Sequence, residues 1–219
     1  MKYETYSRVF ATAYALLATS VLVAAASAPF LAVLLFTPVA SSWPLLVPTA
    51  PFLGPAVAAA HAVFGSGTSD VVRGFARGWW SHGRRAAVVA GVASGVLVVL
   101  AVDVRAAWGS PVGAVAIPVL AVLALLTVVT ALVTLTAVVE RPDVPVQRLA
   151  RACLFLALRR AHFSVVSLAV LWVFAAAVGA LPVPALGLLT GPALYVVWVG
   201  NRATLRGVRA VEEPELAAR

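Results

Sequence analysis

Cysteine is almost absent from this chain, and the motifs typical of enzymes are missing. Cys153 is the only cysteine in 219 residues, so the chain can form no internal disulfide and cannot supply a cysteine-based metal site alone. We find no Walker-type phosphate loop, HExxH, GxSxG or cysteine pair with metal spacing. We therefore expect a protein that is not an enzyme and that holds no cofactor and no metal.

Charge is scarce as well, and acidic residues are the scarcer kind. Only 11% of the residues are charged and 63% are hydrophobic, whereas a soluble domain carries about 25% charged residues. A net charge of +8 would suggest nucleic acid in a soluble protein, but here the arginines lie in short segments between apolar runs. We expect one integral membrane domain over 1–219, with anionic lipid headgroups as partners and no nucleic acid.

The apolar runs predict an all-α fold, a polytopic membrane helix bundle of about six transmembrane helices. A helix needs roughly 20 apolar residues to cross ~30 Å of hydrocarbon. The predicted spans are 9–36, 43–64, 86–102, 112–139, 163–181 and 184–200. The prolines of Leu181-Pro182-Val183-Pro184 separate the last two. The second run carries four prolines, so it is either a kinked span or a re-entrant segment.

The basic residues predict the orientation of the chain. If all these runs cross, 15 of the 16 basic residues lie on one side and only Arg105 lies on the other. The positive-inside rule makes the crowded side cytoplasmic, with both termini on it. Ala26-Ser27-Ala28 resembles a signal-peptidase site, but the apolar run continues to Phe36, which favours an uncleaved anchor over a cleaved leader.

Two basic connections, 69–85 and 143–160, predict interfacial amphipathic helices on the cytoplasmic side. In the first, Val71, Phe75 and Trp79 recur at helical spacing, which places them on one face. The residues expected at lipid headgroups are Arg73, Arg77, Trp79, Trp80, Arg84, Arg85, Arg159 and Arg160. The alternative for the first segment is a flexible basic loop. Both segments end in an arginine pair, which suggests a degenerate internal repeat, with chance as the alternative.

The proline-rich second run also predicts a local break. Pro55 cannot donate a backbone hydrogen bond and its ring crowds the carbonyl of Pro51, so a helix through Gly54-Pro55 should open or kink. The freed carbonyls must then be met by other helices or by water. We expect a polar cavity beside Pro51, Gly54 and Pro55.

The same run carries a family resemblance. The motifs are the segment Pro48-Thr49-Ala50-Pro51-Phe52-Leu53-Gly54-Pro55-Ala56 and the basic aromatic stretch Phe75-Ala76-Arg77-Gly78-Trp79-Trp80. Together they resemble the YesL-like family of small bacterial multi-pass membrane proteins of unknown function, with similarity extending from the first helix to Arg209. The chain departs from the family at His61, where an aromatic residue is common. The resemblance implies the bacterial cell membrane and an accessory role to a carbohydrate transport or utilisation system, and it brings no catalytic residues.

Few polar residues interrupt the apolar runs. Thr127, Thr130 and Thr134 share one helix face, where they either line a passage or make interhelical hydrogen bonds. His61, His82 and His162 all lie toward the predicted cytoplasmic side, which leaves a shared ligand site as an alternative to isolated histidines. The leading hypothesis is a non-enzymatic accessory protein, and the second is a small transporter or permease component. Polar groups that face a cavity would favour the second, since an accessory bundle packs shut. The sequence specifies neither the solute nor the oligomeric state.

Overall fold

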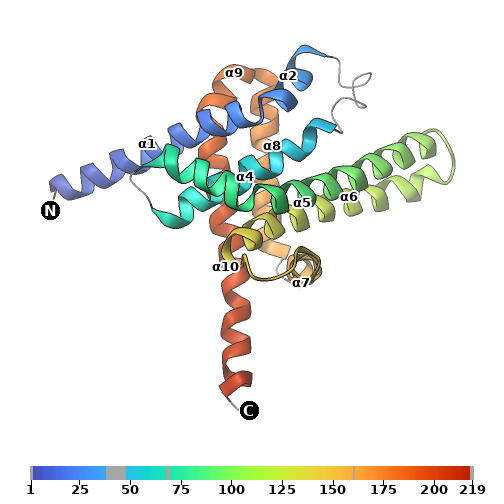
Figure 1. The fold of residues 1–219 in the computed structure, drawn as a ribbon. Coiled ribbons are helices and arrows are strands. Elements are labelled where there is room, and N and C mark those ends of the chain that lie inside the picture. The colour runs from blue at the N-terminus through green and yellow to red at the C-terminus, as the bar shows by residue number, and fades with distance from the viewer. Residues whose placement is uncertain (1, 38–47, 68–69, 160, 218–219) are drawn as a thin grey trace.

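The structure is a computed structural model that describes residues 2–37, 48–67, 70–159 and 161–217, and this part of the chain is all-α (Figure 1). The helices are α1 (Lys2–Ala26), α2 (Ala28–Phe36), α4 (Leu53–Ser66), α5 (Val71–Ala107), α6 (Gly113–Glu140), α7 (Val146–Arg159), α8 (Ala161–Ala180), α9 (Pro182–Pro184) and α10 (Thr190–Ala217). A 3-10 turn, Ala50–Phe52, leads into α4, and a π-helical segment, Ala185–Leu189, leads into α10.

Within the described ranges, three helical stretches are long and apolar enough to cross a membrane: α5, α6 and Pro182–Leu205. The pair α1 and α2 would add a fourth span if its two halves count as one, while Ala50–Ser66 and Val165–Ala180 are apolar but shorter. The prediction of an all-α chain with several apolar helices is therefore confirmed. Six spans stay a prediction, and residues 43–47 of the second one lie outside the described residues.

The first predicted span, 9–36, is wrong as a single helix, because the chain bends by 74° between α1 and α2. The bend lies at Ser27, whose hydroxyl donates to the carbonyl of Val23 at 2.5 Å. Pro29 follows in the first turn of α2 and has no N–H to continue the helical ladder. The local sequence Ser27-Ala28-Pro29 is therefore the physical reason for the break.

The predicted separation between an interfacial segment 69–85 and a span 86–102 is also wrong, since α5 runs unbroken from Val71 to Ala107. Asp70 caps the helix by accepting a hydrogen bond from the backbone N–H of Arg73 at 3.2 Å. No proline lies between Asp70 and Ala107. Arginine favours helix, so the pair Arg84-Arg85 gives the chain no reason to stop.

The second basic connection has a different form. Here α7 is a separate amphipathic helix that ends at Arg159, and α8 begins at Ala161. The first hydrogen bonds of α7 go to the carbonyl of Pro145, from the N–H groups of Arg148 and Leu149. In Figure 1 α7 and α8 run in different directions, whereas the first connection is part of the continuous helix α5, and this difference weighs against the predicted repeat.

The other element ends follow the predictions more closely. α6 and α8 begin and end within two residues of the predicted spans 112–139 and 163–181, and α8 stops just before Leu181. α10 continues far beyond residue 200, to Ala217. In Figure 1, α5 and α6 form a long antiparallel hairpin, and α8 and α10 run crosswise to it.

The centre of the molecule is α4, which packs against α1, α5, α6 and α10. Its contact with α5 is very close, because a Cβ at Gly54 would collide with the backbone carbonyl of Ala86. α10 approaches α1 in the same way at Gly191, where the backbone N–H donates to Ser20 Oγ at 2.7 Å. Small residues on α4, including Ala56, Ala58, Ala59 and Ala60, are fully buried, so the surrounding helices converge on it.

Candidate functional site

A cavity of about 630 Å³, hereafter the polar cavity, opens between the C-terminal parts of α4 and α6, the N-terminal part of α5, the middle of α10 and one face of α7. Its polar and aromatic lining residues are His61, Ser66, His82, Glu140, Arg141, Cys153, Trp198 and Arg202. Apolar lining comes from Leu149, Leu156 and Leu205. Five helices therefore bring ionisable, aromatic and aliphatic groups to one hollow.

An ion pair and an aromatic ring define one wall of the polar cavity. Arg202 Nε lies 3.1 Å from Glu140 Oε1, which joins α10 to the end of α6. The guanidinium carbon of Arg202 lies 4.9 Å from the ring centroid of Trp198, one turn earlier on α10. Both contacts hold the Arg202 side chain in place, since a cation over an indole face and a charge-assisted pair are each favourable.

Three buried polar side chains meet behind this wall, one from each of three helices. His61 of α4 and Thr136 of α6 are fully buried, and Asn201 of α10 is 4% exposed. Asn201 Nδ2 donates to Thr136 Oγ1 at 3.0 Å, and Thr136 Oγ1 lies 3.3 Å from His61 Nδ1. The hydroxyl also lies 3.1 Å from the carbonyl of Leu132. Thr136 is therefore the hub of a hydrogen-bonded triad that links α4, α6 and α10.

The other ring nitrogen of His61 has no such partner. Among the described residues, Nε2 is buried and makes no hydrogen bond, although His61 lines the polar cavity. A buried polar atom without a partner costs roughly 1–3 kcal/mol. This atom is where a bound molecule could complete the hydrogen bonding of the triad.

The edge of the polar cavity is fixed by a side chain from α5. Arg85 Nη1 donates to the carbonyl of Pro142 at 2.6 Å, and Nη2 donates to that of Val144. The α6–α7 connection is thereby held close to the end of α5. Cys153 of α7 lies on the same cavity, and burial raises the pKa of its thiol to about 11, while a hydrogen bond with Thr134 acts in the opposite direction.

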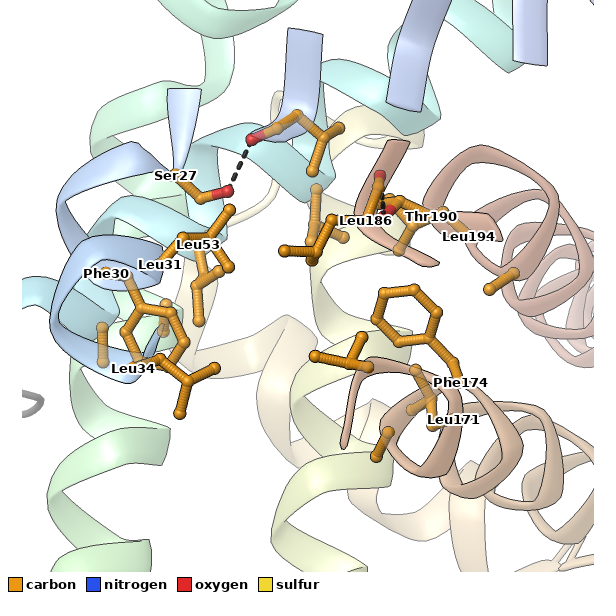
Figure 2. A pocket seen from close by; sticks show the side chains of 18 of the residues that line it. Ser27, Phe30, Leu31, Leu34, Leu53, Leu171, Phe174, Leu186, Thr190 and Leu194 are labelled. Carbon is orange, nitrogen blue, oxygen red and sulfur yellow. Dashed lines mark hydrogen bonds between the residues drawn. The ribbon is translucent and has the colours of Figure 1, made fainter. Parts of the chain in front are cut away.

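A second cavity, hereafter the apolar cavity, has a volume of about 780 Å³ and is lined by none of the three triad residues (Figure 2). Phe30, Leu31 and Leu34 of α2 face Leu171 and Phe174 of α8 across it. Two of its hydroxyl groups bond to carbonyls four residues earlier in the chain, since Ser27 donates to Val23 and Thr190 donates to Leu186. The wall is consequently almost wholly hydrocarbon.

The two cavities lie in series along α4, α6 and α10. On α4 the last residue that lines the apolar cavity is Val57, and the first that lines the polar cavity is His61. On α10 the apolar cavity ends at Leu194 and the polar cavity begins at Trp198. On α6 the apolar cavity ends at Leu135 and the polar cavity begins at Ala137, and these two residues point to nearly opposite faces of the helix. Five side chains between the two cavities have no exposed surface, and we name them the closed layer: Ala58, Ala59, Ala60, Thr136 and Val197.

The residues predicted to form a kink and a cavity lie at the entrance of α4. Pro51 belongs to the 3-10 turn, and Gly54 and Pro55 lie in the first turn of α4. Gly54 lines the apolar cavity, whose wall there is hydrocarbon rather than polar. A proline in a first helical turn loses no hydrogen bond, which explains why α4 itself continues without a bend.

The predicted threonine stripe does not line either cavity within the described residues. Thr127 donates to the carbonyl of Leu123, and Thr134 to that of Thr130. Thr130 Oγ1 is buried and, in the described part of the chain, makes no hydrogen bond. Within the stripe, Thr134 also contacts Cys153 of α7, and Thr136, which joins α4, α6 and α10, lies outside the stripe. Asn201 is the only asparagine of the chain and sits just past a predicted span, which is the signal that could have singled it out.

The residues predicted at lipid headgroups divide into two groups. Arg77, Trp80, Arg84 and Arg159 are exposed, and Arg73 is exposed beside Asp70, with Nε 3.2 Å from a carboxylate oxygen. Trp79 instead stacks on Phe75, which is buried with Val71 against α1 and α4, and Arg85 is engaged with the α6–α7 connection. Arg160 lies outside the described residues. Part of the predicted membrane face of this segment is thus protein core.

Of the three histidines, His61 and His82 line the same polar cavity, while the side chain of His162 lies outside the described part of the chain. Among the described side chains, no group of three His, Cys, Asp or Glu residues is placed to hold a metal ion.

Comparisons with protein-family models, with curated proteins and with solved structures find no match to this chain. The resemblance to the YesL-like family stays a prediction.

Proposed function

We propose that the protein is a small permease component, a multi-pass membrane protein that passes a solute with a polar and an apolar part along α4, α6 and α10. The observation that carries this proposal is the polar cavity, which is separated from a second cavity on the same three helices by a closed layer. The two cavities contact nearly opposite faces of α6, so this helix, with the fully buried Thr136, lies between them. Passage from one hollow to the other therefore requires α6 to move against its neighbours.

The buried polar groups support a functional reading over simple packing. Polar side chains are costly inside an apolar helical protein, and they persist there chiefly where they serve a pathway or a site. Here His61, Thr136 and Asn201 meet at one point beside a cavity, and Glu140 and Arg202 lie at its wall. An accessory bundle that packs shut would be better served by aliphatic residues at these positions.

The distribution of arginines supports placing the polar cavity on the cytoplasmic side. Arg141 and Arg202 line it and Arg85 lies at its edge, whereas Arg105 is at the far end of α5. By the positive-inside rule the cavity then opens to the cytoplasm of a bacterial cell, with both termini on that side. The proposal contains no catalytic step, since a Cys153 thiol with a pKa of about 11 is protonated at neutral pH and is a poor nucleophile.

A second candidate is an accessory protein for a carbohydrate transport system, as the family resemblance implies. The observation that favours it is the exposed surface of α7, where Phe155 and Leu158 are exposed beside Arg148 and Arg151. Such a surface suits anionic lipid or the flank of a membrane partner. It does not need either cavity.

Cysteine accessibility separates the two candidates. In a Cys153→Ala background, Ala62→Cys places a thiol on the polar cavity, and Val122→Cys places one on the exposed apolar surface of α6. In proteoliposomes a permease admits a small water-soluble thiol reagent to Ala62→Cys, while Val122→Cys, surrounded by lipid, stays unmodified. No modification of Ala62→Cys, in protein whose folding is verified by gel filtration, would contradict the permease and leave the accessory role.

A further inference from the structure

We infer that the polar cavity binds a small organic anion, one that bears a carboxylate or a phosphate, through the guanidinium of Arg141 and Nε2 of His61. This rests on the proposed function, because it names the class of solute for the same cavity. Two independent features point to the site: unbalanced positive charge on its wall, and a fully buried imidazole nitrogen without a partner.

The ion pair on the cavity wall carries no net charge. Glu140 and Arg202 form an ion pair at 3.1 Å and both line the cavity, and Glu140 Oε1 accepts no hydrogen bond from the described residues. Among the described residues Arg141 makes no ion pair, so it is the one lining charge left uncompensated. Arg85 adds positive charge at the edge, and the exposed Asp143 in the α6–α7 connection opposes it. The net field inside the cavity favours an anion.

The direction of the Thr136 hydroxyl decides which nitrogen of His61 carries the proton. Its hydroxyl oxygen already accepts a hydrogen bond from Asn201, and its single proton can go to the Leu132 carbonyl or to His61 Nδ1. When it goes to Nδ1, the neutral imidazole carries its own proton on Nε2 and presents a donor to the cavity. An anion selects that arrangement, since it accepts from Nε2 and relieves the unpaired buried atom.

The remaining wall indicates that the anion carries an organic part. The cavity volume of about 630 Å³ is far larger than one water's share of liquid volume, about 30 Å³. Leu149, Leu156 and Leu205 offer apolar surface in the same cavity as the charged groups. The anion could be a free solute or the head of a phospholipid, and both present the same chemistry to Arg141.

Alkylation of a cavity thiol tests the inference. In Cys153→Ala, Ala62→Cys protein held in phosphatidylcholine nanodiscs, we compare the rates of iodoacetate, an anion, and iodoacetamide, its neutral analogue, each relative to the denatured protein. We expect the cavity to favour iodoacetate by about threefold to tenfold at low salt, and to lose this preference in 1 M salt. Arg141→Gln should abolish the preference, whereas Arg141→Lys and the exposed control Arg148→Gln should keep it.

Competition then identifies the source of the anion. Protection of the thiol by millimolar glycerol 3-phosphate supports a free solute, and protection on exchange into phosphatidylglycerol nanodiscs supports a lipid head. Equal normalised rates for the two reagents, or the same result for Arg141→Gln and Arg148→Gln, would overturn the anion site while leaving the permease in place. A thiol that reacts with neither reagent would remove both the permease and the anion site.

Discussion

Asn201 of α10 donates a hydrogen bond to Thr136 of α6 at 3.0 Å, in a part of the molecule where both side chains are buried. The same threonine oxygen lies 3.3 Å from His61 of α4, so one hydroxyl group joins three helices. Removal of that hydroxyl should therefore weaken the packing of all three helices.

We predict that Thr136→Val, which keeps the shape of the side chain, destabilises the protein by about 1–3 kcal/mol, because Asn201 Nδ2 and His61 Nδ1 both lose their partner. Thr127→Val is the matched control, since the Thr127 hydroxyl bonds only the carbonyl of Leu123 in its own helix. Reversible unfolding in mixed micelles measures both. Equal stability of the two variants would show that the triad does not hold the helices together.

Close packing of α4 on α5 gives a second prediction. A methyl group at Gly54 would collide with the carbonyl of Ala86, so Gly54→Ala should separate the helices and lower the stability by about 1–3 kcal/mol. Gly95 on α5 has open space around it, and Gly95→Ala should stabilise the protein by up to ~1 kcal/mol through helix propensity. A Gly54→Ala variant that melts at or above the wild-type temperature would contradict the close contact.

The two adjacent arginines of α5 should behave differently. Arg85 bonds the carbonyls of Pro142 and Val144 through two guanidinium nitrogens, whereas Arg84 is exposed. Arg85→Lys keeps the charge but cannot donate to both carbonyls through a planar guanidinium. It should raise amide hydrogen exchange at the non-proline residues of 142–149 by about tenfold. Arg84→Lys should leave that exchange unchanged. Matching exchange in both variants would argue against an anchored connection.

The thiol of Cys153 should lose its proton only at high pH. Since its pKa is raised to about 11 and the thiolate is the reactive form, its alkylation rate should still rise about tenfold per pH unit between pH 8 and pH 10. The half-exposed neighbour Leu154, replaced as Leu154→Cys in the Cys153→Ala background, should approach its plateau near pH 9. Mass spectrometry of the alkylated peptide measures both rates, and a plateau for Cys153 near pH 9 would contradict its burial.

The sequence predicts the parts of the fold that depend on composition alone. The ends of α6 and α8 were placed well because long apolar runs stop there at glycine, proline or charge. The bend at Ser27 and the unbroken α5 were missed for opposite reasons. Ser27-Ala28-Pro29 breaks an apolar run locally, whereas Arg84-Arg85 interrupts hydropathy without interrupting the helix.

The candidate site was harder to predict than the helices. The sequence places His61 near the predicted cytoplasmic side, but the contact of His61 with Thr136 depends on how α4 crosses α6. The pairing of Glu140 with Arg202 likewise joins residues at the ends of separate helices. Helical periodicity assigns a residue to a face of its own helix, and it does not say which other helix that face meets. The stripe of Thr127, Thr130 and Thr134 stays a prediction, and Thr136, which contacts His61 and Asn201, lies on a nearly opposite face of α6.

The side of the membrane from which a thiol in the polar cavity can be modified decides whether this cavity opens to the cytoplasm. Ala62→Cys in the Cys153→Ala background is exposed to a membrane-impermeant maleimide, once in intact cells and once in inverted membrane vesicles. If the polar cavity is a water-filled solute site open to the cytoplasm, the thiol reacts in inverted vesicles and stays unmodified in intact cells. Reaction from the outside only, or from neither side, would contradict a cytoplasmic solute cavity bounded by α4, α6 and α10.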